Sequence, residues 1–142
     1  ALELTYDVLR DVFSKDFAVR NQSPVDLGEN FEAVPDVAVI KGKARDFKAA
    51  HPKTADLIVG ISDTTLSYDR NRKASLYAKF GISDYWILNL KNRTLEVYRH
   101  PMEDENAFYG FSYAEKLTFD ETQIISPLVA PEAKIKVADL LP

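Results

Sequence analysis

The chain has 142 residues, of which 46% are hydrophobic and 28% are charged, a composition typical of one folded domain with its own core. It contains no cysteine, which excludes disulfide frameworks and thiolate metal sites and is compatible with a reducing compartment. The formal net charge of −4 and the pI near 5.2 argue against binding nucleic acid by bulk electrostatics, although a local basic cleft is compatible with both.

Apolar runs such as YWILNL and DLIVGI are too short to span a bilayer, and no export leader pattern opens the chain. We therefore expect a cytoplasmic protein without a membrane partner. No repeat or Pro/Gly/Ser linker divides the sequence, so we predict a single domain over residues 1–142. Because the chain starts at Ala1 within a helical pattern, we expect that a preceding segment was removed or never included.

The N-terminal half predicts one helix followed by extended segments. Apolar residues at helical spacing in ELTYDVLRDVF indicate a helix at the N-terminus. The run FAVRNQSPVDL is extended and is interrupted at Pro24. PDVAVI, residues 35–40, is rich in Val and Ile and predicts a buried strand.

The segment ADLIVGIS, residues 55–62, predicts a second buried strand because both of its faces are apolar. Alternation places Gly60 and Ser62 on the face of Ile58, with Leu57 on the other face. A glycine inside a strand removes a packing side chain and marks a bulge, a close backbone approach or a lost residue. Which of these applies to Gly60 bears directly on function.

Beyond this strand the pattern changes to a helix and then to a hairpin. Apolar residues near helical spacing run from Ala74 to Phe80; Asp69 is a candidate N-terminal cap and Gly81 a C-terminal stop. DYWILNL and TLEVYRH flank the short turn KNR, and further strand patterns follow at FSYAEKLTF, TQIIS and KIKV. These elements predict an α/β (α+β) fold with a central mixed β-sheet flanked by helices.

Several chemistries are excluded by the absence of their motifs: the sequence has no glycine-rich phosphate loop, G-x-S-x-G elbow or H-E-x-x-H pair. Its two histidines, His51 and His100, each precede a proline and are interpreted as loop residues. Three charged residues remain as candidates: Asp36 at the start of one strand, Asp56 before the next strand, and Lys73 near the start of the helix. An acid and a lysine that meet beside strand ends can hold a hard divalent cation and stabilise the charge on a phosphate. Purely structural roles for these residues are the simpler interpretation.

Positive residues cluster in KGKARDFK, residues 41–48, and in DRNRK, residues 69–73, while residues 103–105 form an acidic loop. On charge alone each cluster is interpreted as a solvated face.

The run PDVAVI, ADLIVGISDTTLSYDRNRKASLYAKFGISDYWILNL and TLEVYRHP resembles the Uma-type family of putative restriction endonucleases, within the PD-(D/E)XK nuclease superfamily. The resemblance is strongest over residues 17–101. It rests on PD before an apolar strand, SDTT after the next strand, DR and K at the helix start, and YWI in the following strand. It implies a restriction-endonuclease-like fold and DNA phosphodiester hydrolysis that depends on Mg²⁺, or alternatively on Mn²⁺.

By this resemblance Asp36 is the PD acid and a metal ligand, and the main-chain carbonyl of Ile61 is a second ligand. Gly60 stands where the family has a catalytic glutamate, and Ser62 stands where the simple motif has lysine. The helix residue Lys73 is expected to supply that lysine instead. Arg70, Arg72 and Lys73 are expected to contact DNA.

Gly60 is then most simply a lost catalytic acid. A single carboxylate holds Mg²⁺ poorly, and catalysis depends on placing the ion, so we expect a weakened or inactive enzyme. An acid from elsewhere in the chain could substitute for it: Glu32, Asp63, or an acid on the N-terminal helix such as Glu3 or Asp7. We expect Asp36 and Lys73 to converge beside Gly60, with Ser62 pointing the same way.

Three hypotheses follow: a Mg²⁺-dependent DNA endonuclease, a nuclease-derived nucleic-acid-binding module without turnover, and a protein-interaction domain that keeps the fold. Duplex DNA is the expected partner in the first two. The resemblance, together with the aromatic-rich strands around Tyr85, Trp86 and Tyr98, also leads us to predict a homodimer.

Overall fold

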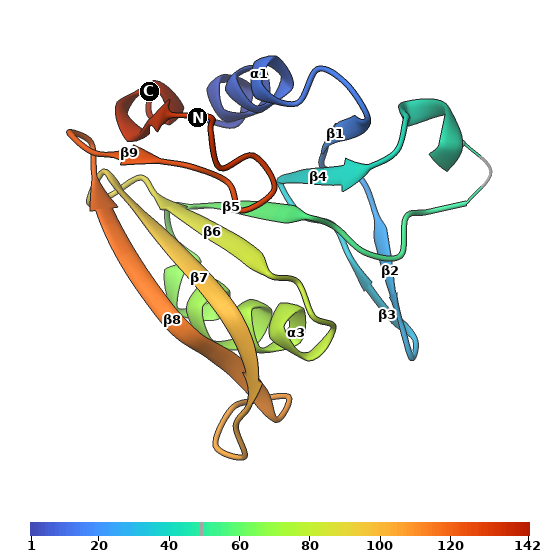
Figure 1. Ribbon diagram of the computed structural model, residues 1–142. Coiled ribbons are helices and arrows are strands. Elements are labelled where there is room, and N and C mark those ends of the chain that lie inside the picture. Colours follow the sequence, from blue (N-terminus) through green and yellow to red (C-terminus); the bar gives the residue numbers. More distant parts are fainter. Residues whose placement is uncertain (49) are drawn as a thin grey trace.

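A mixed six-stranded sheet, in the order β1-β4-β5-β6-β7-β8, forms the centre of the computed structural model, which describes residues 1–48 and 50–142. Figure 1 shows helix α1 and the C-terminal segment on one face of the sheet and helix α3 on the other. The predicted α+β architecture with a central mixed sheet is confirmed.

The elements have the following bounds. The strands of the main sheet are β1 (Phe17–Asn21), β4 (Val37–Lys41), β5 (Leu57–Ser62), β6 (Asp84–Asn89), β7 (Thr94–Glu103) and β8 (Phe111–Asp120). Two small antiparallel sheets consist of β2 (Val25–Gly28) with β3 (Phe31–Ala33) and β9 (Ile124–Ile125) with β10 (Ile135–Lys136). The helical elements are α1 (Leu2–Val12), η1 (Ala44–Phe47), α2 (Leu66–Tyr68), the π-helical η2 (Asp69–Lys73), α3 (Ala74–Lys79) and η3 (Val137–Leu140).

Two apolar cores lie on the two faces of the sheet. Leu57 and Val59 of β5 pack in the core that α1 covers, whereas Ile58 packs in the core that α3 covers. Strand β5 pairs antiparallel with β4 and parallel with β6, and the helical segment from α2 to α3 makes the crossover between β5 and β6. The predicted buried strand with two apolar faces is therefore confirmed.

The helical crossover begins before the predicted start. The prediction that Asp69 caps this helix is wrong, because α2 already begins at Leu66 and leads directly into η2. Asp69 is buried and accepts a hydrogen bond from the Thr65 hydroxyl at 3.0 Å, so its carboxylate is held inside the turn. Gly81, with φ of +74°, ends the segment as predicted.

The aromatic side chains of the β6–β7 hairpin belong to the core. Tyr85 and Trp86 are fully buried and Tyr98 is 6% exposed. They consequently offer no surface to a second copy of the chain, and the predicted homodimer loses this argument while remaining a prediction.

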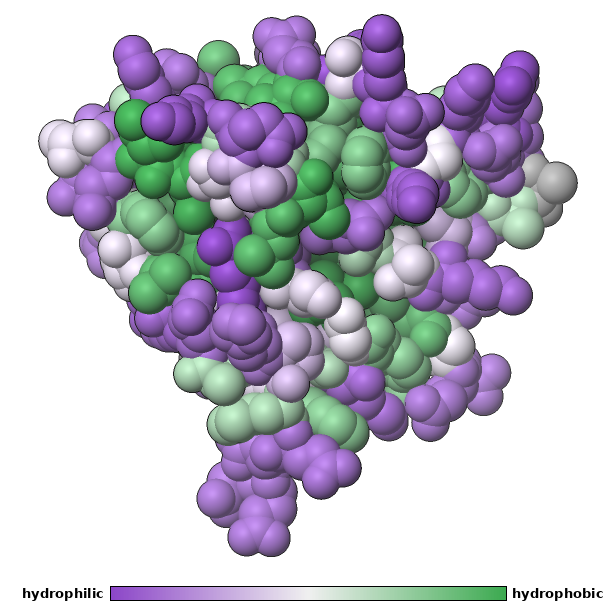
Figure 2. All heavy atoms as spheres, in the orientation of Figure 1, coloured by the Kyte–Doolittle hydropathy of each residue, from purple (hydrophilic) through white to green (hydrophobic). Residues whose placement is uncertain are grey.

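The face of the molecule seen in Figure 2 carries apolar patches between hydrophilic side chains and ends in a hydrophilic lower tip. Figure 2 shows apolar residues gathered over α1, β9 and the C-terminal segment, whereas the tip of the β7–β8 hairpin is hydrophilic. Within residues 1–48 and 50–142, no helix combines the length and the apolar character that a membrane crossing requires.

Candidate functional site

Strands β4 and β5 bring Asp36 and Gly60 together. Val37 pairs with Val59, so the residue before Val37 lies opposite the residue after Val59, and opposite residues of an antiparallel pair share a face. Asp36 is half-buried, and its Oδ2 accepts the main-chain N–H of Ile61 at 2.7 Å. The Asp36 carboxylate therefore lies on the same face as Gly60 and accepts a main-chain hydrogen bond just beyond the last β4–β5 pair.

Gly60 faces the hydroxyl end of Tyr85 on the neighbouring strand. A Cβ atom at Gly60 would lie 3.6 Å from the Tyr85 hydroxyl oxygen, which is ordinary van der Waals contact. That hydroxyl donates to the main-chain carbonyl of Asp69 at 3.2 Å, and burial raises the pKa of Tyr85 well above its usual value. The space beside Gly60 thus ends at a neutral phenol, and no close backbone contact requires a glycine there.

Lys73 lies above this region on η2 and is paired. Its Nζ is 3.5 Å from Oδ1 of Asp69, whose other oxygen accepts the Thr65 hydroxyl. The pKa of Tyr77 is raised by burial, and the charges of Asp69 and Asp36 add to this rise. Tyr77 packs in the same core as Ala38 of β4 and Ile58 of β5. Asp36, Gly60 and the helix that carries Lys73 therefore lie on the same side of the sheet.

Three buried polar atoms on this face have no hydrogen-bond partner among the described residues. They are Arg20 Nη1, Ser62 Oγ and Asn89 Nδ2. Arg20 pairs with Ala38 of β4, whereas Ser62 and Asn89 are neighbours in the parallel β5–β6 register. Buried polar groups are normally satisfied, so an ordered water is the simplest partner for this pair. Ser62 points to the face of Gly60 as expected, but a serine hydroxyl does not replace the charge of a lysine.

Arg70, expected to contact DNA, has a side chain that is 39% exposed and forms an ion pair with the buried side chain of Glu96. Its Nε lies 2.9 Å and 3.1 Å from the two carboxylate oxygens of Glu96, and its Nη2 lies 2.5 Å from one of them. Glu96 is 1% exposed and also accepts the Tyr98 hydroxyl at 2.7 Å. Burial raises the pKa of Glu96. The hydrogen bonds from Arg70 and Tyr98 and the charge of Lys116 together lower it by more, so the pKa lies below the usual value for glutamate.

Arg72 differs from Arg70 because its guanidinium lies on aromatic rings. Its Cζ is 4.2 Å from the centroid of the Phe108 ring and 6.0 Å from that of Tyr68. The structure therefore divides the predicted basic cluster: Arg70 stabilises the core, whereas Lys73 and Arg72 lie at the surface of the crossover helix.

The donor set does not fit a Mg²⁺ ion. Beside Gly60 the only carboxylate that the β4–β5 register provides is that of Asp36, and one of its oxygens already accepts the Ile61 N–H. Within the part of the chain that the structure describes, no three His, Cys, Asp or Glu side chains are grouped to hold a metal ion. Mg²⁺ binds poorly to so few oxygen ligands, and nothing in the geometry selects the Ile61 carbonyl as a ligand.

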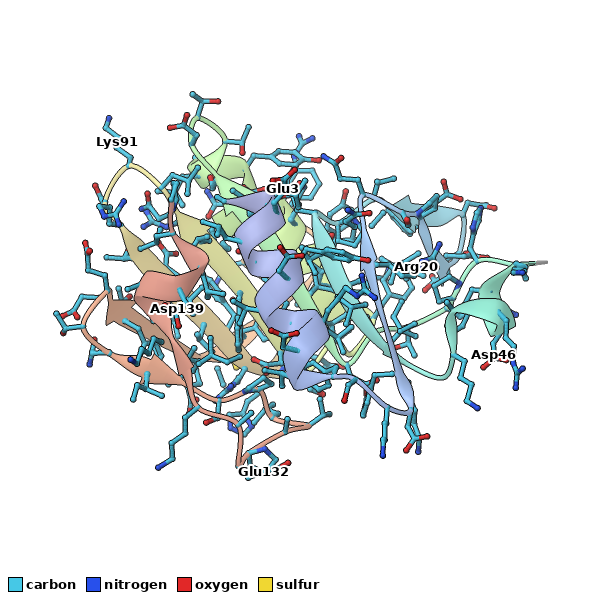
Figure 3. All side chains as sticks on the ribbon, turned by 90° about the horizontal axis from the view of Figure 1, so that it is seen from above. Glu3, Arg20, Asp46, Lys91, Glu132 and Asp139 are labelled. Atoms are coloured by element: carbon cyan, nitrogen blue, oxygen red, sulfur yellow. The ribbon has the colours of Figure 1, made fainter. Side chains whose placement is uncertain are left out.

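The replacement acids do not complete the set either. Glu3 and Asp7 lie on α1, which covers the opposite face of the sheet; Figure 3 shows Glu3 on this helix in front of the sheet. Glu32 on β3 and Asp63 after β5 are exposed. The contacts around the site that sequence reasoning missed are those of Asp69, Tyr77 and Tyr85, because they depend on the parallel β5–β6 register and on the path of the crossover helix.

Comparison with known proteins agrees with this architecture. The pattern of the Uma2 family, described as "putative restriction endonuclease", matches residues 2–138. Among solved structures, the chain is similar to a putative nuclease belonging to DUF820 from Anabaena variabilis, with a TM-score of 0.70 and 17% sequence identity over 98% of this chain and 76% of that one. No curated protein matches. At this identity the structural similarity establishes a shared nuclease-like fold.

Proposed function

The chain belongs to the Uma2 family of putative restriction endonucleases, and from that premise we propose that it is a nuclease-derived protein that binds duplex DNA but cuts it slowly or not at all. The single observation that carries the proposal is the composition of the site on the nuclease-like fold. Asp36 is retained, whereas the position opposite it is Gly60, with the neutral Tyr85 hydroxyl beyond.

The loss of a carboxylate affects cleavage more than binding. Phosphodiester hydrolysis in a metal-dependent nuclease needs an ion held in one place, and the remaining donors do not fit such an ion. DNA binding depends instead on cations that neutralise phosphates. Lys73 and Arg72 lie on the helical crossover that follows β5 and supply positive charge in a chain whose net charge is −4.

What the present residues do follows from their contacts. Asp36 fixes the end of β5 through the Ile61 N–H, and Asp69 holds Lys73 within reach of the same face. The net negative charge predicts modest affinity, and the small number of cations at the site predicts a shallow decrease of log affinity with log salt, because this slope scales with the number of phosphates contacted.

The test measures binding and nicking separately. Binding of a labelled duplex is followed by fluorescence anisotropy over a series of salt concentrations, and nicking of a supercoiled plasmid is followed with added Mg²⁺ or Mn²⁺. We expect binding that weakens with salt, a loss of affinity in Lys73→Ala, and no change in Lys134→Ala, an exposed lysine on the side of the sheet that α1 covers. Nicking is expected to stay at background in the parent chain and in Asp36→Ala.

Two results would contradict the proposal. Metal-dependent nicking by the parent chain that is as fast as that of Gly60→Glu and disappears in Asp36→Ala would mean that an active site is complete without an acid at Gly60. The absence of duplex binding even at low salt would instead favour a protein-interaction domain that keeps the nuclease fold.

A further inference from the structure

Two exposed aromatic rings lie together at the outer edge of the crossover helix. Phe108 is 58% exposed and Tyr68 is 50% exposed, and within the described residues they are the only aromatic members of the large exposed hydrophobic set. Arg72 joins them, with its Cζ 4.2 Å from the Phe108 centroid and 6.0 Å from the Tyr68 centroid. We call Tyr68, Arg72 and Phe108 the aromatic platform.

The platform borders an open hollow of about 660 Å³ whose chemistry suits an anion with flat rings. Besides the platform itself, the hollow is lined by uncharged polar residues that include Thr64, Ser67 and Asn71. Among the described residues that line it, none is a carboxylate and Arg72 is a cation. In a chain with a net charge of −4, this local excess of positive charge favours a negatively charged ligand.

Phe108 is held in place before any ligand binds. The neighbouring Tyr109 N–H donates to Ser75 Oγ at 2.8 Å, and the Ser75 hydroxyl donates to the Phe111 carbonyl at 2.7 Å. The rings of Phe108 and Tyr109 meet edge to face with centroids 4.7 Å apart. A ring fixed in this way loses little conformational entropy on binding, which favours affinity.

The hollow continues toward the candidate site on one side and toward the hairpin on the other. Lys73 Nζ lies 5.8 Å from the Tyr68 ring, so the platform adjoins the helix above Gly60. A second hollow of about 500 Å³ shares Asn71 and Phe108 with the first and reaches Lys116 on β8. This path has Arg72 and Lys116 near its two ends and rings in the middle, a shape that suits an extended strand; the carboxylate of Asp104 also lines the second hollow, and Lys116 is paired with Glu96 at 3.7 Å.

We propose that the aromatic platform binds single-stranded DNA by stacking unpaired bases on Phe108 and Tyr68, while Arg72 contacts the strand's phosphates. Bases in an intact duplex are already stacked on each other, whereas unpaired bases offer free π-faces to aromatic and guanidinium groups. The inference deepens the proposed function, on which its choice of DNA rests, by adding a site for a locally opened or single strand.

The test compares two labelled ligands of equal length, an oligothymidylate and an abasic sugar-phosphate oligomer, by fluorescence anisotropy. We expect the oligothymidylate to bind at least about ten-fold more tightly. Phe108→Ala and Tyr68→Ala should each weaken oligothymidylate binding about ten-fold and leave the abasic oligomer unaffected, whereas Phe108→Trp should retain binding. Arg72→Ala should weaken both ligands and reduce the slope of log affinity against log salt by about 0.7.

Matched controls lie away from the platform. Ile124→Ala removes an apolar side chain that is 50% exposed, and Arg45→Ala removes an exposed arginine on η1. Neither should change binding of either oligomer. Because all the substituted platform side chains are at the surface, circular dichroism spectra and melting temperatures should match those of the parent chain.

The inference is overturned when Phe108→Ala and Tyr68→Ala both bind oligothymidylate as the parent does, or when the parent binds both oligomers equally. Duplex binding measured on the same variants separates the two claims. Unchanged duplex binding without base-dependent single-strand binding would refute the platform and leave the proposed function standing. Base-dependent single-strand binding without any duplex binding would support the platform and refute the proposed function.

Discussion

Replacing Arg70 with alanine should destabilise the protein, because it leaves a buried carboxylate without its main partner. Arg70 makes a two-pronged ion pair with Glu96, whose side chain is 2% exposed. Removing one partner of a fully buried pair typically costs about 3–5 kcal/mol. The Arg70 side chain is 39% exposed, and Tyr98 and Lys116 still contact Glu96 after the change, so solvent screening and residual partners reduce the expected cost to about 2 kcal/mol.

The assay is urea unfolding followed by circular dichroism. With a slope of about 2 kcal/mol per molar urea, this cost lowers the unfolding midpoint by about 1 M. The matched control is Arg93→Ala, which removes a surface pair with Glu121 whose side chains are 43% and 45% exposed. That pair should contribute less than about 1 kcal/mol.

The pH dependence tests the cause of the loss. In the parent chain the folded-state pKa of Glu96 is lowered, so its contribution to stability is present above the usual glutamate pKa and is lost as the pH falls through the folded-state value. Without Arg70, burial dominates and moves this pKa upward, so the variant keeps Glu96 protonated at higher pH. The difference in the free energy of unfolding between the parent chain and Arg70→Ala should therefore be largest near neutral pH and should become smaller in acid.

A double variant gives the decisive comparison. Arg70→Ala combined with Glu96→Gln removes the buried charge and should be more stable at neutral pH than Arg70→Ala alone. The reasoning is refuted if Arg70→Ala costs no more than Arg93→Ala, or if the double variant is the less stable of the two at neutral pH.

Three further predictions concern the candidate site and its surroundings. Gly60→Ala should raise the free energy of unfolding by about 0.5 kcal/mol in thermal melts, because its Cβ meets the Tyr85 hydroxyl at an ordinary 3.6 Å and the unfolded chain loses freedom; a marked destabilisation would mean that the backbone there needs glycine. Asp36→Ala should cost about 1–2 kcal/mol by leaving the Ile61 N–H unpaired, and Asp36→Asn should recover most of it in the same melts; equal losses in the two variants would mean that the negative charge matters more than the hydrogen bond. Burial is the main cause that raises the pKa values of four of the seven tyrosines, Tyr77, Tyr85, Tyr98 and Tyr113. Ultraviolet titration should therefore show these four ionising only as the protein unfolds in alkali. Their contribution to stability is present below the usual tyrosine pKa and is lost above it.

Local sequence patterns were sufficient for the strands that build the centre of the sheet. The apolar run of β5 and its division into two faces follow from period-two alternation, and Leu57 and Ile58 do enter different cores. The hairpin of β6 and β7 follows from its two apolar runs and the short turn between them.

The helix start was mispredicted for a reason that lies outside its own sequence. Aspartate is a common N-terminal cap, but Asp69 is satisfied by Thr65 and Lys73 and is covered by the sheet below, so the helix begins earlier. Tertiary contacts outweighed the local preference at this position.

Contacts between residues far apart in sequence could not be predicted from one chain. The Tyr85 hydroxyl meets Gly60 only because β5 and β6 pair in parallel in a specific register. Phe108 and Arg72 are 36 positions apart and meet because the loop after β7 is bound to Ser75 of α3. Likewise, the charge of Arg70 suggested a contact with DNA. Its ion pair with Glu96 could not be predicted, because the position of strand β7 in the sheet was not known from the sequence.

The central claim, that Gly60 stands for a missing metal ligand, is tested most directly by Gly60→Glu. Melting temperature and plasmid nicking are measured with and without Mn²⁺ or Mg²⁺ for the parent chain, Gly60→Glu, Gly60→Ala, and Gly60→Glu combined with Asp36→Ala. At a metal concentration about 100-fold above the dissociation constant, binding adds about 2.7 kcal/mol to the native state, a rise of several degrees.

Only Gly60→Glu is expected to gain both the metal-dependent rise in melting temperature and the nicking, because only this variant places a second carboxylate beside Asp36. This expectation is contradicted if the parent chain nicks DNA as fast as Gly60→Glu, or if Gly60→Glu folds and shows neither a metal-dependent shift nor nicking.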